Sequence, residues 1–268
     1  MRTSDAKIRE RRAKLIQILH NNPDTAIPEL SQLLNVSQAT IRRDIKFLEN
    51  KDQISTSFSS TDSGIKMDIL PEFDSDVLYH TNIKEKEKIA QSAAKMLKSG
   101  DVVFINSSST ALRVIKYIEQ DFVTVITNNA RSLLEPLNNK VKLILIGGEV
   151  IRNAASTNSK MCTTGDYAVS QIENVLANVC IIGVSGITED RGLSTAVINE
   201  LTINREMIKS CFGEVIVVAD HRKIGVNHNY LFADISNVNY LITDNKSNPE
   251  NIKKIEKEGV EVILVNAE

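Results

Sequence analysis

Apolar and polar residues alternate at helical spacing along the N-terminal part of the chain. Residues 7–20 carry a stripe of Ile and Leu side chains on one helical face, and residues 28–34 repeat the pattern over a shorter length. Pro28 is tolerated because it falls in the first turn, and Asn35 suits the left-handed conformation that ends many helices. The pattern predicts two helices joined by a turn at residues 21–24.

A third amphipathic helix is predicted from Ser37, which is a favourable N-cap residue. Ile41 and Ile45 fall on one side of this helix, whereas Arg42 and Arg43 project from its first turns on the other side. Two helices, a tight turn and a third helix within about 45 residues are typical of a helix-turn-helix, whose last helix enters a DNA groove. DNA binding is therefore the leading hypothesis for this segment.

The residues after the third helix are rich in Ser and Thr. Residues 53–64 predict a two-stranded wing anchored by Ile54 and Phe58, and residues 65–82, which contain Pro71, predict a linker. The expected parts of the chain are a winged helix-turn-helix at 1–64, a linker at 65–82, and an effector-binding and oligomerisation domain at 83–268.

The rest of the chain alternates between continuous apolar runs and helical patterns. The expected strands are residues 102–106, 123–127, 142–146, 179–184, 215–219, 240–243 and 260–265. The expected helices are residues 84–98, 110–120, 129–138, 163–176, 198–211 and 249–258. Buried strands separated by helices predict a mostly parallel sheet covered on both faces. The fold class is thus α/β, with a winged helix-turn-helix ahead of the sheet domain.

Composition narrows the class of protein. The 268 residues are 42% hydrophobic and only 4% aromatic, so Ile, Val, Leu and Ala must fill the core. No apolar run approaches the roughly 18–20 residues that cross a bilayer, and the N-terminus has no apolar region typical of a secretion signal. Cys162, Cys180 and Cys211 are widely spaced, and the histidines have no HxxxH spacing. We expect buried thiols in a cytoplasmic protein without metal or cofactor.

Charge is spread unevenly along the chain. Residues 1–51 contain ten Lys or Arg and six Asp or Glu residues, which gives about +4. Since the whole chain carries −2, the remaining residues carry about −6. A basic head on an acidic body fits a head that meets DNA phosphates, although many solvated helices have a similar charge pattern.

The helix-turn-helix supplies the candidate DNA contacts. Gln38, Ala39, Arg42 and Arg43 lie where a recognition helix meets base edges, and Arg pairs bidentately with guanine. The remaining candidates, which would contact phosphates or support the start of the helix, are Arg9, Arg11, Arg12, Ser37, Thr40, Lys46 and Lys51.

Five loops at the carboxyl ends of the predicted strands are polar or rich in glycine. Ligands bind at this edge of open parallel sheets, and a hydroxyl-rich loop that feeds a helix suits an anion. Simple turns, an N-cap with surface serines, or a solvated Asp–Lys pair are alternative interpretations of single loops. Their shared character favours an effector site made of Asn106, Ser107, Ser108, Ser109, Thr110, Thr127, Asn128, Gly147, Gly148, Arg152, Gly183, Ser185, Glu200, Asp220 and Lys223.

The chain resembles the DeoR family of bacterial transcription regulators. The family signature is matched by Arg11, Leu15, Leu19, Ser37, Thr40, Ile41, Arg42, Arg43, Asp44 and Ile45. Further matching segments are residues 85–86, 89–90, 125–128, 146–148, 182–187, 192–195, 205–208, 218–220 and 241–244. The resemblance implies an effector domain related to sugar-phosphate isomerases, a phosphorylated sugar effector, a double-stranded DNA operator and a homodimer or homotetramer. It further implies repression of a catabolic operon, in the nucleoid when the operator is bound.

Three features depart from the pattern of the family that the chain resembles: a loop, a replaced Lys and the wing. Asn106 replaces an Asp that usually begins the loop after the first strand, and Ser108 replaces a Gly in the same loop. Asn204 replaces a common Lys. Residues 52–65 contain no Lys, Arg or His, although the family wing usually carries a basic residue. These changes imply an altered effector and a wing that contacts DNA, if at all, through hydroxyl and backbone groups.

Two alternative functions remain open on the residues alone. A sugar-phosphate isomerase needs a carboxylate base, and Glu200 or Asp220 would supply it. A DNA-binding head has no evident use in such an enzyme. A regulator that activates, or that has lost its ligand, is the other alternative, because the Ser-rich loop differs from the usual one.

Overall fold

The computed structural model describes residues 5–21, 25–49, 54–58, 65–69, 82–152 and 161–267. The chain divides into two compact units, one made mainly of Met1–Thr81 and the other mainly of residues 82–268. Of the described residues, none belongs to a helix that is long and apolar enough to span a membrane.

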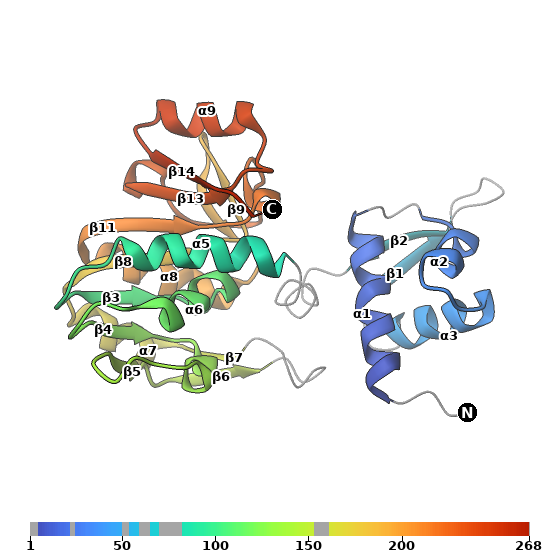
Figure 1. Ribbon diagram of the computed structural model, residues 1–268, viewed down its shortest axis with the longest axis horizontal. Helices are drawn as coiled ribbons and strands as arrows, with labels where there is room; N and C mark the ends of the chain where they lie inside the picture. Colours follow the sequence, from blue (N-terminus) through green and yellow to red (C-terminus); the bar gives the residue numbers. More distant parts are fainter. Residues whose placement is uncertain are drawn as a thin grey trace. The chain divides into compact units, whose positions relative to one another are not determined.

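The described residues of the first unit form three helices and a β-hairpin (Figure 1). Its elements are α1 (Asp5–Asn21), α2 (Ile27–Leu33), α3 (Gln38–Glu49), β1 (Ile54–Phe58) and β2 (Ile65–Ile69). The two strands are antiparallel, with Ile54 opposite Ile69 and Phe58 opposite Ile65. The predicted helix-turn-helix is present, and the hairpin stands where a wing was expected.

The hairpin corrects one prediction. Residues 65–69 were assigned to a linker, but they form β2, the second strand of the wing. The segment places Ile65, Met67 and Ile69 at alternate positions, which is the period of a strand. Lys66 and Asp68 between them give the segment its mixed polarity, and an alternation over only five residues was not taken as a strand.

A small apolar core holds the three helices together. It consists of Leu15, Ile16, Leu19, Ile27, Leu30, Ile41, Ile45 and Leu48. Asn35, in the turn between α2 and α3, has a φ of 49°, as expected for a left-handed residue at a helix end. Ser31 fixes this turn, because its Oγ donates to the Val36 carbonyl at 2.6 Å. The core packs α3 against α1 and α2.

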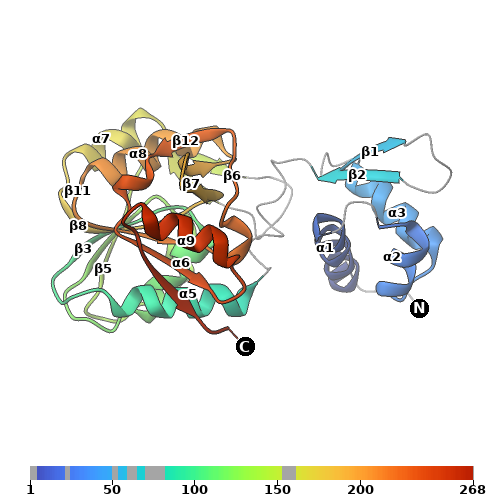
Figure 2. The same cartoon turned by 90° about the horizontal axis from the view of Figure 1, so that it is seen from above.

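The second unit is built on a seven-stranded parallel sheet with the order β14-β13-β11-β8-β3-β4-β5 (Figure 1). These strands are β3 (Val102–Ile105), β4 (Thr124–Thr127), β5 (Lys142–Leu145), β8 (Ala177–Gly183), β11 (Cys211–Val218), β13 (Tyr240–Asp244) and β14 (Glu261–Val265). The helices are α5 (Ile83–Lys95), α6 (Ser109–Val114), α7 (Asp166–Glu173), α8 (Leu201–Lys209) and α9 (Pro249–Lys257). In Figures 1 and 2, α5 and α6 cover one face of the sheet, and α7 and α8 cover the other.

The strand order reverses between β3 and β8. From β3 the chain moves outward through β4 to β5, and it then returns to place β8 on the other side of β3. The crevice at such a reversal, beyond the carboxyl ends of the strands, is where open α/β sheets bind ligands. The segments that follow β3 and β8 are therefore the first places to look for a site.

In the second unit, smaller β strands lie outside the main sheet, and the sequence pattern predicted none of them. β6 (Glu149–Arg152) and β7 (Met161–Thr164) form an antiparallel hairpin. A separate sheet pairs β9 (Gly186–Thr188), β10 (Gly192–Thr195) and β12 (Tyr230–Ala233) in the order β12-β10-β9. These strands are only three or four residues long, which is too short for an apolar alternation to be distinctive.

Several predicted helices are shorter than expected. Residues 129–138 contain only the 3₁₀ segment η3 (Ala130–Leu134), because Glu135 precedes Pro136 and takes an extended ψ of 140°. Residues 163–164 belong to β7, and residue 211 begins β11. Other 3₁₀ segments are η2 (Ile115–Tyr117), η4 (Ile198–Glu200), η5 (His221–Lys223) and η6 (Ile235–Asn237).

The main core lies between the sheet and the α7–α8 layer. Phe104, Cys180, Ile182, Met207 and Val217 are fully buried there. The three cysteines are free thiols, of which Cys162 and Cys180 are buried and Cys211 is partly buried. Burial raises the pKa of the Cys180 thiol well above its ordinary value, so this side chain packs as a small apolar group.

Candidate DNA-binding surface and effector site

Helix α3 begins at a serine cap and separates its apolar face from its basic face. The Thr40 amide donates to Ser37 Oγ at 3.2 Å, which satisfies one of the free N–H groups at the helix start. Ile41 and Leu48 are buried in the core of the first unit. The predicted base-reading and phosphate-contacting residues of this helix that lie at the surface are Gln38, Ala39, Arg42, Arg43 and Lys46.

Asp44 links the recognition helix to α1. Its side chain is only 2% exposed, and its two oxygens accept from Arg11 Nε at 2.7 Å and from Arg12 Nε at 2.8 Å. The Arg12 guanidinium also lies over the Phe47 ring, 3.6 Å from the ring centroid. Both arginines were predicted to contact phosphate, and this stays a prediction; their Nε groups bond to Asp44 and tie α3 to α1. The Arg9 side chain and Lys51 lie outside the described residues.

Asn106 follows β3 at the point where the strand order reverses, and its side chain bonds to the end of β8. Its Nδ2 donates to the Gly183 carbonyl at 2.9 Å and to Asn204 Oδ1 at 3.1 Å. Its Oδ1 accepts from the Gly183 amide at 3.0 Å and from the Ser108 amide at 3.3 Å. The side chain is 1% exposed. These four bonds engage both of its N–H groups and its oxygen, so its hydrogen-bonding groups are saturated by the protein. Asn106 and Asn204, two positions that depart from the family pattern, are partners in one hydrogen bond.

The residues after Asn106 cap α6 and contact a buried glutamate. Ser108 Oγ accepts from the Thr110 and Ala111 amides, so these helix-start N–H groups already have a partner. Ser107 Oγ donates to Glu200 Oε1 at 3.1 Å. Thr195 Oγ1 donates to Glu200 Oε2 at 3.0 Å. Glu200 thus joins β10 to the loop after β3.

Gly183 leaves no room for a side chain. A Cβ at this position would lie 1.8 Å from Ser108 Oγ, so only glycine lets β8 approach the cap of α6. Gly148, with a φ of 151°, would place a Cβ 2.5 Å from the Thr164 carbonyl. Both glycines serve close packing at the predicted edge. Gly147 is held by Gln171, and the Arg152 side chain lies outside the described residues.

The end of β4 lies beside the β6–β7 hairpin. Asn128 Nδ2 donates to the Thr163 carbonyl at 3.0 Å, and the Thr163 amide donates back to the Asn128 carbonyl at 2.9 Å. Thr127, Asn128 and Ser132 are all buried. The hydroxyl and amide groups from β3, β4 and β7 therefore gather at one edge, together with Glu200.

A second, charged cluster lies at the end of β11. Asp220 is 2% exposed and accepts from Arg222 Nε at 2.9 Å and from Arg222 Nη2 at 3.1 Å. Burial opposes ionisation of Asp220, but Arg222, Lys86 and Lys223 outweigh it and lower its pKa to about 2. Arg113 of α6 also belongs to this cluster, since it acts on Lys86 and pairs with Glu87 at 3.2 Å.

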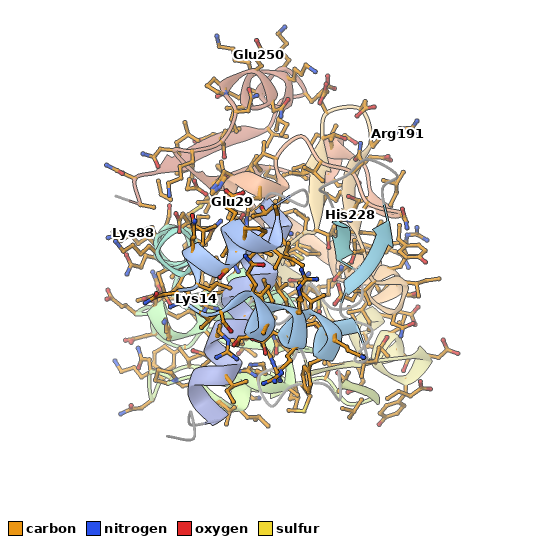
Figure 3. The ribbon with its side chains drawn as sticks, turned by 90° about the vertical axis from the view of Figure 1, so that its right-hand side faces the viewer. Lys14, Glu29, Lys88, Arg191, His228 and Glu250 are labelled. Carbon is orange, nitrogen blue, oxygen red and sulfur yellow. The ribbon has the colours of Figure 1, made fainter. Side chains whose placement is uncertain are left out.

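Lys86 is the most perturbed cation of this cluster. Burial lowers its pKa to about 7 despite the attraction of Asp220, and Arg222, Arg113 and Lys223 lower it further. Lys88, two positions later on α5, lies at the surface (Figure 3). A half-charged lysine surrounded by cations gains strongly from a bound anion, because the anion favours its protonated form.

The start of α5 is tied to the same strand ends. Asn82 Nδ2 lies 3.5 Å from Asp220 Oδ1, and Lys246 Nζ donates to Glu85 Oε1 at 2.5 Å. Lys86, Arg113, Asn204 and Ser132 were not among the predicted site residues. The burial of Lys86 could have been predicted from the sequence, because its spacing places it on the helical face of Ile89, Ala90 and Ala93, which are all buried.

Two family models match the chain, one in each unit. A model described as the DeoR C terminal sensor domain matches residues 81–245, and a DeoR-like helix-turn-helix domain matches residues 11–57. The chain belongs to the DeoR family. It is therefore a DNA-binding transcription regulator with a sensor domain, and not the isomerase considered as an alternative.

Three relatives of the DeoR-family chain are informative. It is 31% identical to the HTH-type transcriptional regulator GolR of Listeria innocua, over 94% of this chain and 97% of GolR. It is 28% identical to the HTH-type transcriptional repressor GlcR of Bacillus subtilis, over 95% of each chain. It is also 28% identical to the putative aga operon transcriptional repressor of Escherichia coli O157:H7, over 96% of this chain and 93% of that one.

Proposed function

We propose that this protein represses a sugar catabolic operon and that a phosphorylated sugar, or a derivative of one, controls its affinity for the operator. The names of the GlcR and aga operon relatives support repression. The exposed basic face of α3 supports operator binding by Arg42 and Arg43, with Lys46 on the phosphates. The proposal that a phosphorylated sugar is the effector rests on the two clusters at the carboxyl edge of the sensor sheet.

The division of charge between these clusters is the observation that carries the proposal. The ends of β3, β4 and β10 offer hydroxyl and amide groups with one carboxylate, Glu200. The end of β11 brings Lys86, Arg113, Arg222 and Lys223 near Asp220, and Arg113 also pairs with Glu87. A sugar phosphate has the matching parts, since its hydroxyls bond to the neutral cluster and its phosphate to the cations.

This assignment shifts the expected place of the phosphate. The loop at residues 106–110 was predicted to hold an anion with free N–H groups, but Ser108 Oγ already accepts from the Thr110 and Ala111 amides. We therefore assign the phosphate to Lys86 and Lys223, and the neutral groups around Ser107 and Glu200 to the hydroxyl groups of the effector. Effector binding then favours one of two arrangements of the regulator with different operator affinity.

The remaining features of the proposal follow from how helix-turn-helix proteins read DNA. A single recognition helix reads one half-site, and a symmetric operator requires two copies. We propose a homodimer or homotetramer assembled through the sensor domain, with the winged head at the N-terminus. The regulator would act in the cytoplasm, and in the nucleoid when it is bound to its operator.

Thermal unfolding of the full chain with a panel of phosphorylated sugars tests the effector assignment. A ligand at 100 times its Kd stabilises the native state by about 2.7 kcal/mol, which raises the Tm measurably. Lys223→Met should abolish this rise and Lys86→Met should reduce it, whereas Lys140→Met should preserve it, because the Lys140 side chain pairs with Asp121 at the surface. A Tm that no compound changes would contradict the proposal and favour a ligand-independent or activating regulator.

A further inference from the structure

Two buried polar atoms follow β4 without a hydrogen-bond partner. Among the side chains that the structure describes, Asn128 Oδ1 and Ser132 Oγ are inaccessible to solvent and receive or donate no hydrogen bond. Asn128 is 1% exposed and Ser132 is fully buried. A buried polar group without a partner is costly, and native proteins retain few such groups. Two that lie four residues apart call for a functional reason.

The orientation of the Asn128 amide is fixed by its neighbour. Its Nδ2 donates to the Thr163 carbonyl at 3.0 Å, and a rotated amide would set two acceptors against each other. The oxygen therefore faces away from this bond to β7. Strand β4 pairs with β3, with Ile105 opposite Thr127, so the next residue of each strand, Asn106 and Asn128, lie side by side at the carboxyl edge.

Ser132 lies in η3, which begins directly after Asn129. Its amide donates to the Asn129 carbonyl at 3.0 Å, which holds the residue near the strand end while its hydroxyl has no partner. The contrast with Thr163 is informative, because Thr163 Oγ1 donates to the Ile146 carbonyl at 2.7 Å. One buried hydroxyl at this edge stabilises the fold, and the other does not.

We propose that Asn128 Oδ1 and Ser132 Oγ form a subsite for a hydroxyl group of the effector. A ligand hydroxyl donates to Asn128 Oδ1 and accepts from Ser132 Oγ, which satisfies both atoms. This inference rests on the proposed sugar-phosphate control and adds the place where a hydroxyl of that sugar is recognised, at the β4 end. A site built to bond a hydroxyl rejects an analogue that lacks it, because its own polar groups then stay unpaired.

Ser132→Ala tests the subsite in two independent ways. The substitution removes an unpartnered buried hydroxyl, so the Tm of the full chain without ligand should stay the same or rise. The affinity for the phosphorylated sugar that stabilises the wild type should fall by about tenfold or more. A deoxy analogue that lacks the recognised hydroxyl should bind the wild type and Ser132→Ala alike. Inorganic phosphate serves as the probe of the cationic cluster and should bind both equally.

Thr163→Val is the matched control, because it removes a buried hydroxyl that has a partner, and it should lower the Tm. A Ser132→Ala variant that loses stability like this control would show a structural hydroxyl and overturn the subsite. Unchanged affinity for a sugar phosphate that binds the wild type would overturn the subsite alone. A panel in which no compound binds the wild type would overturn the subsite together with the proposed sugar-phosphate control.

Discussion

The Asn106–Asn204 hydrogen bond allows a sharp prediction about the sheet edge. Asn106→Asp keeps the shape of the side chain but replaces the Nδ2 donor by an oxygen. That oxygen would face the Gly183 carbonyl, now 2.9 Å from Nδ2, and Asn204 Oδ1, now 3.1 Å away. Two hydrogen bonds are lost, two acceptors lose their donor, and a charge is buried at a residue that is 1% exposed.

The magnitude follows from these losses. Each lost bond with its unpaired partner costs about 1–3 kcal/mol, and the amides of Gly183 and Ser108 still donate to the other oxygen. We expect Asn106→Asp to lower the free energy of unfolding by about 3–5 kcal/mol at pH 7, as for other uncompensated buried charges. Burial raises the pKa of the new carboxyl in the folded state, so this loss should shrink as the pH falls and the acid becomes a donor.

The partner residue provides the decisive comparison. Asn204→Lys alone should also destabilise the chain, but combined with Asn106→Asp it creates an ion pair in place of the amide pair. Urea unfolding of the full chain, followed by circular dichroism, should give a favourable coupling energy of about 2 kcal/mol or more. Asn178→Asp is the control, since its Oδ1 accepts from the Val102 amide and remains an acceptor. Equal small losses for Asn106→Asp and Asn178→Asp, or additive effects in the double variant, would refute this reasoning.

Three further predictions concern the DNA surface and the effector site. In fluorescence anisotropy, Arg42→Ala should cost about 1–3 kcal/mol at the operator only, whereas Lys46→Ala should weaken all DNA alike and reduce the salt slope by about one. Asp44→Asn should destabilise the head by about 3 kcal/mol, because it leaves Arg11 and Arg12 without their buried carboxylate, and operator binding should fail while the sensor domain still unfolds at its usual Tm. Phosphate affinity should fall as the pH rises above about 7, because Lys86 then loses its charge, and Lys86→Met should remove this pH dependence.

Each of these predictions has a contradicting result. Equal losses of Arg42→Ala on operator and scrambled DNA would remove its base-reading role. An Arg11→Ala variant that keeps its stability but reduces the salt slope would show that this arginine contacts phosphate and does not stabilise the head. The pH effect has a counterpart in stability, since a lowered Lys pKa in the folded state makes the unfolding free energy rise between pH 7 and 10. A flat profile in both measurements would contradict the buried position of Lys86.

The sequence pattern predicted the elements that bury a regular apolar face. The three head helices and the seven parallel strands have strong periodicity, and the strands lie within a few residues of their predicted bounds. Residues 129–138 were predicted as a helix, but only a short 3₁₀ segment forms, because Pro136 keeps Glu135 extended. The hairpin β6–β7 and the three-stranded sheet of β9, β10 and β12 were missed, because three or four residues bury too few side chains to leave a pattern.

The candidate site was predictable in place but not in detail. The carboxyl edge follows from the order of parallel strands, so the loops that contain Asn106, Asn128 and Asp220 were named correctly as neighbours of that edge. Partnerships across the fold left no local signal: Asn106 meets Asn204 at a separation of 98 residues, and Lys86 meets Asp220 from the first helix of the sensor domain. The role of Asp44 was hidden for the same reason, since its two arginines lie on another helix.

The central claim is that effector binding at the sensor sheet changes the operator affinity of the winged head. The most direct measurement is fluorescence anisotropy of the full chain with DNA from upstream of its own gene, with a scrambled duplex at the same salt, titrated with and without each phosphorylated sugar. The account predicts tight, specific binding that one phosphorylated sugar weakens, and no such response in Lys223→Met. Specific binding that no phosphorylated sugar alters, or an undiminished response in Lys223→Met, would contradict it.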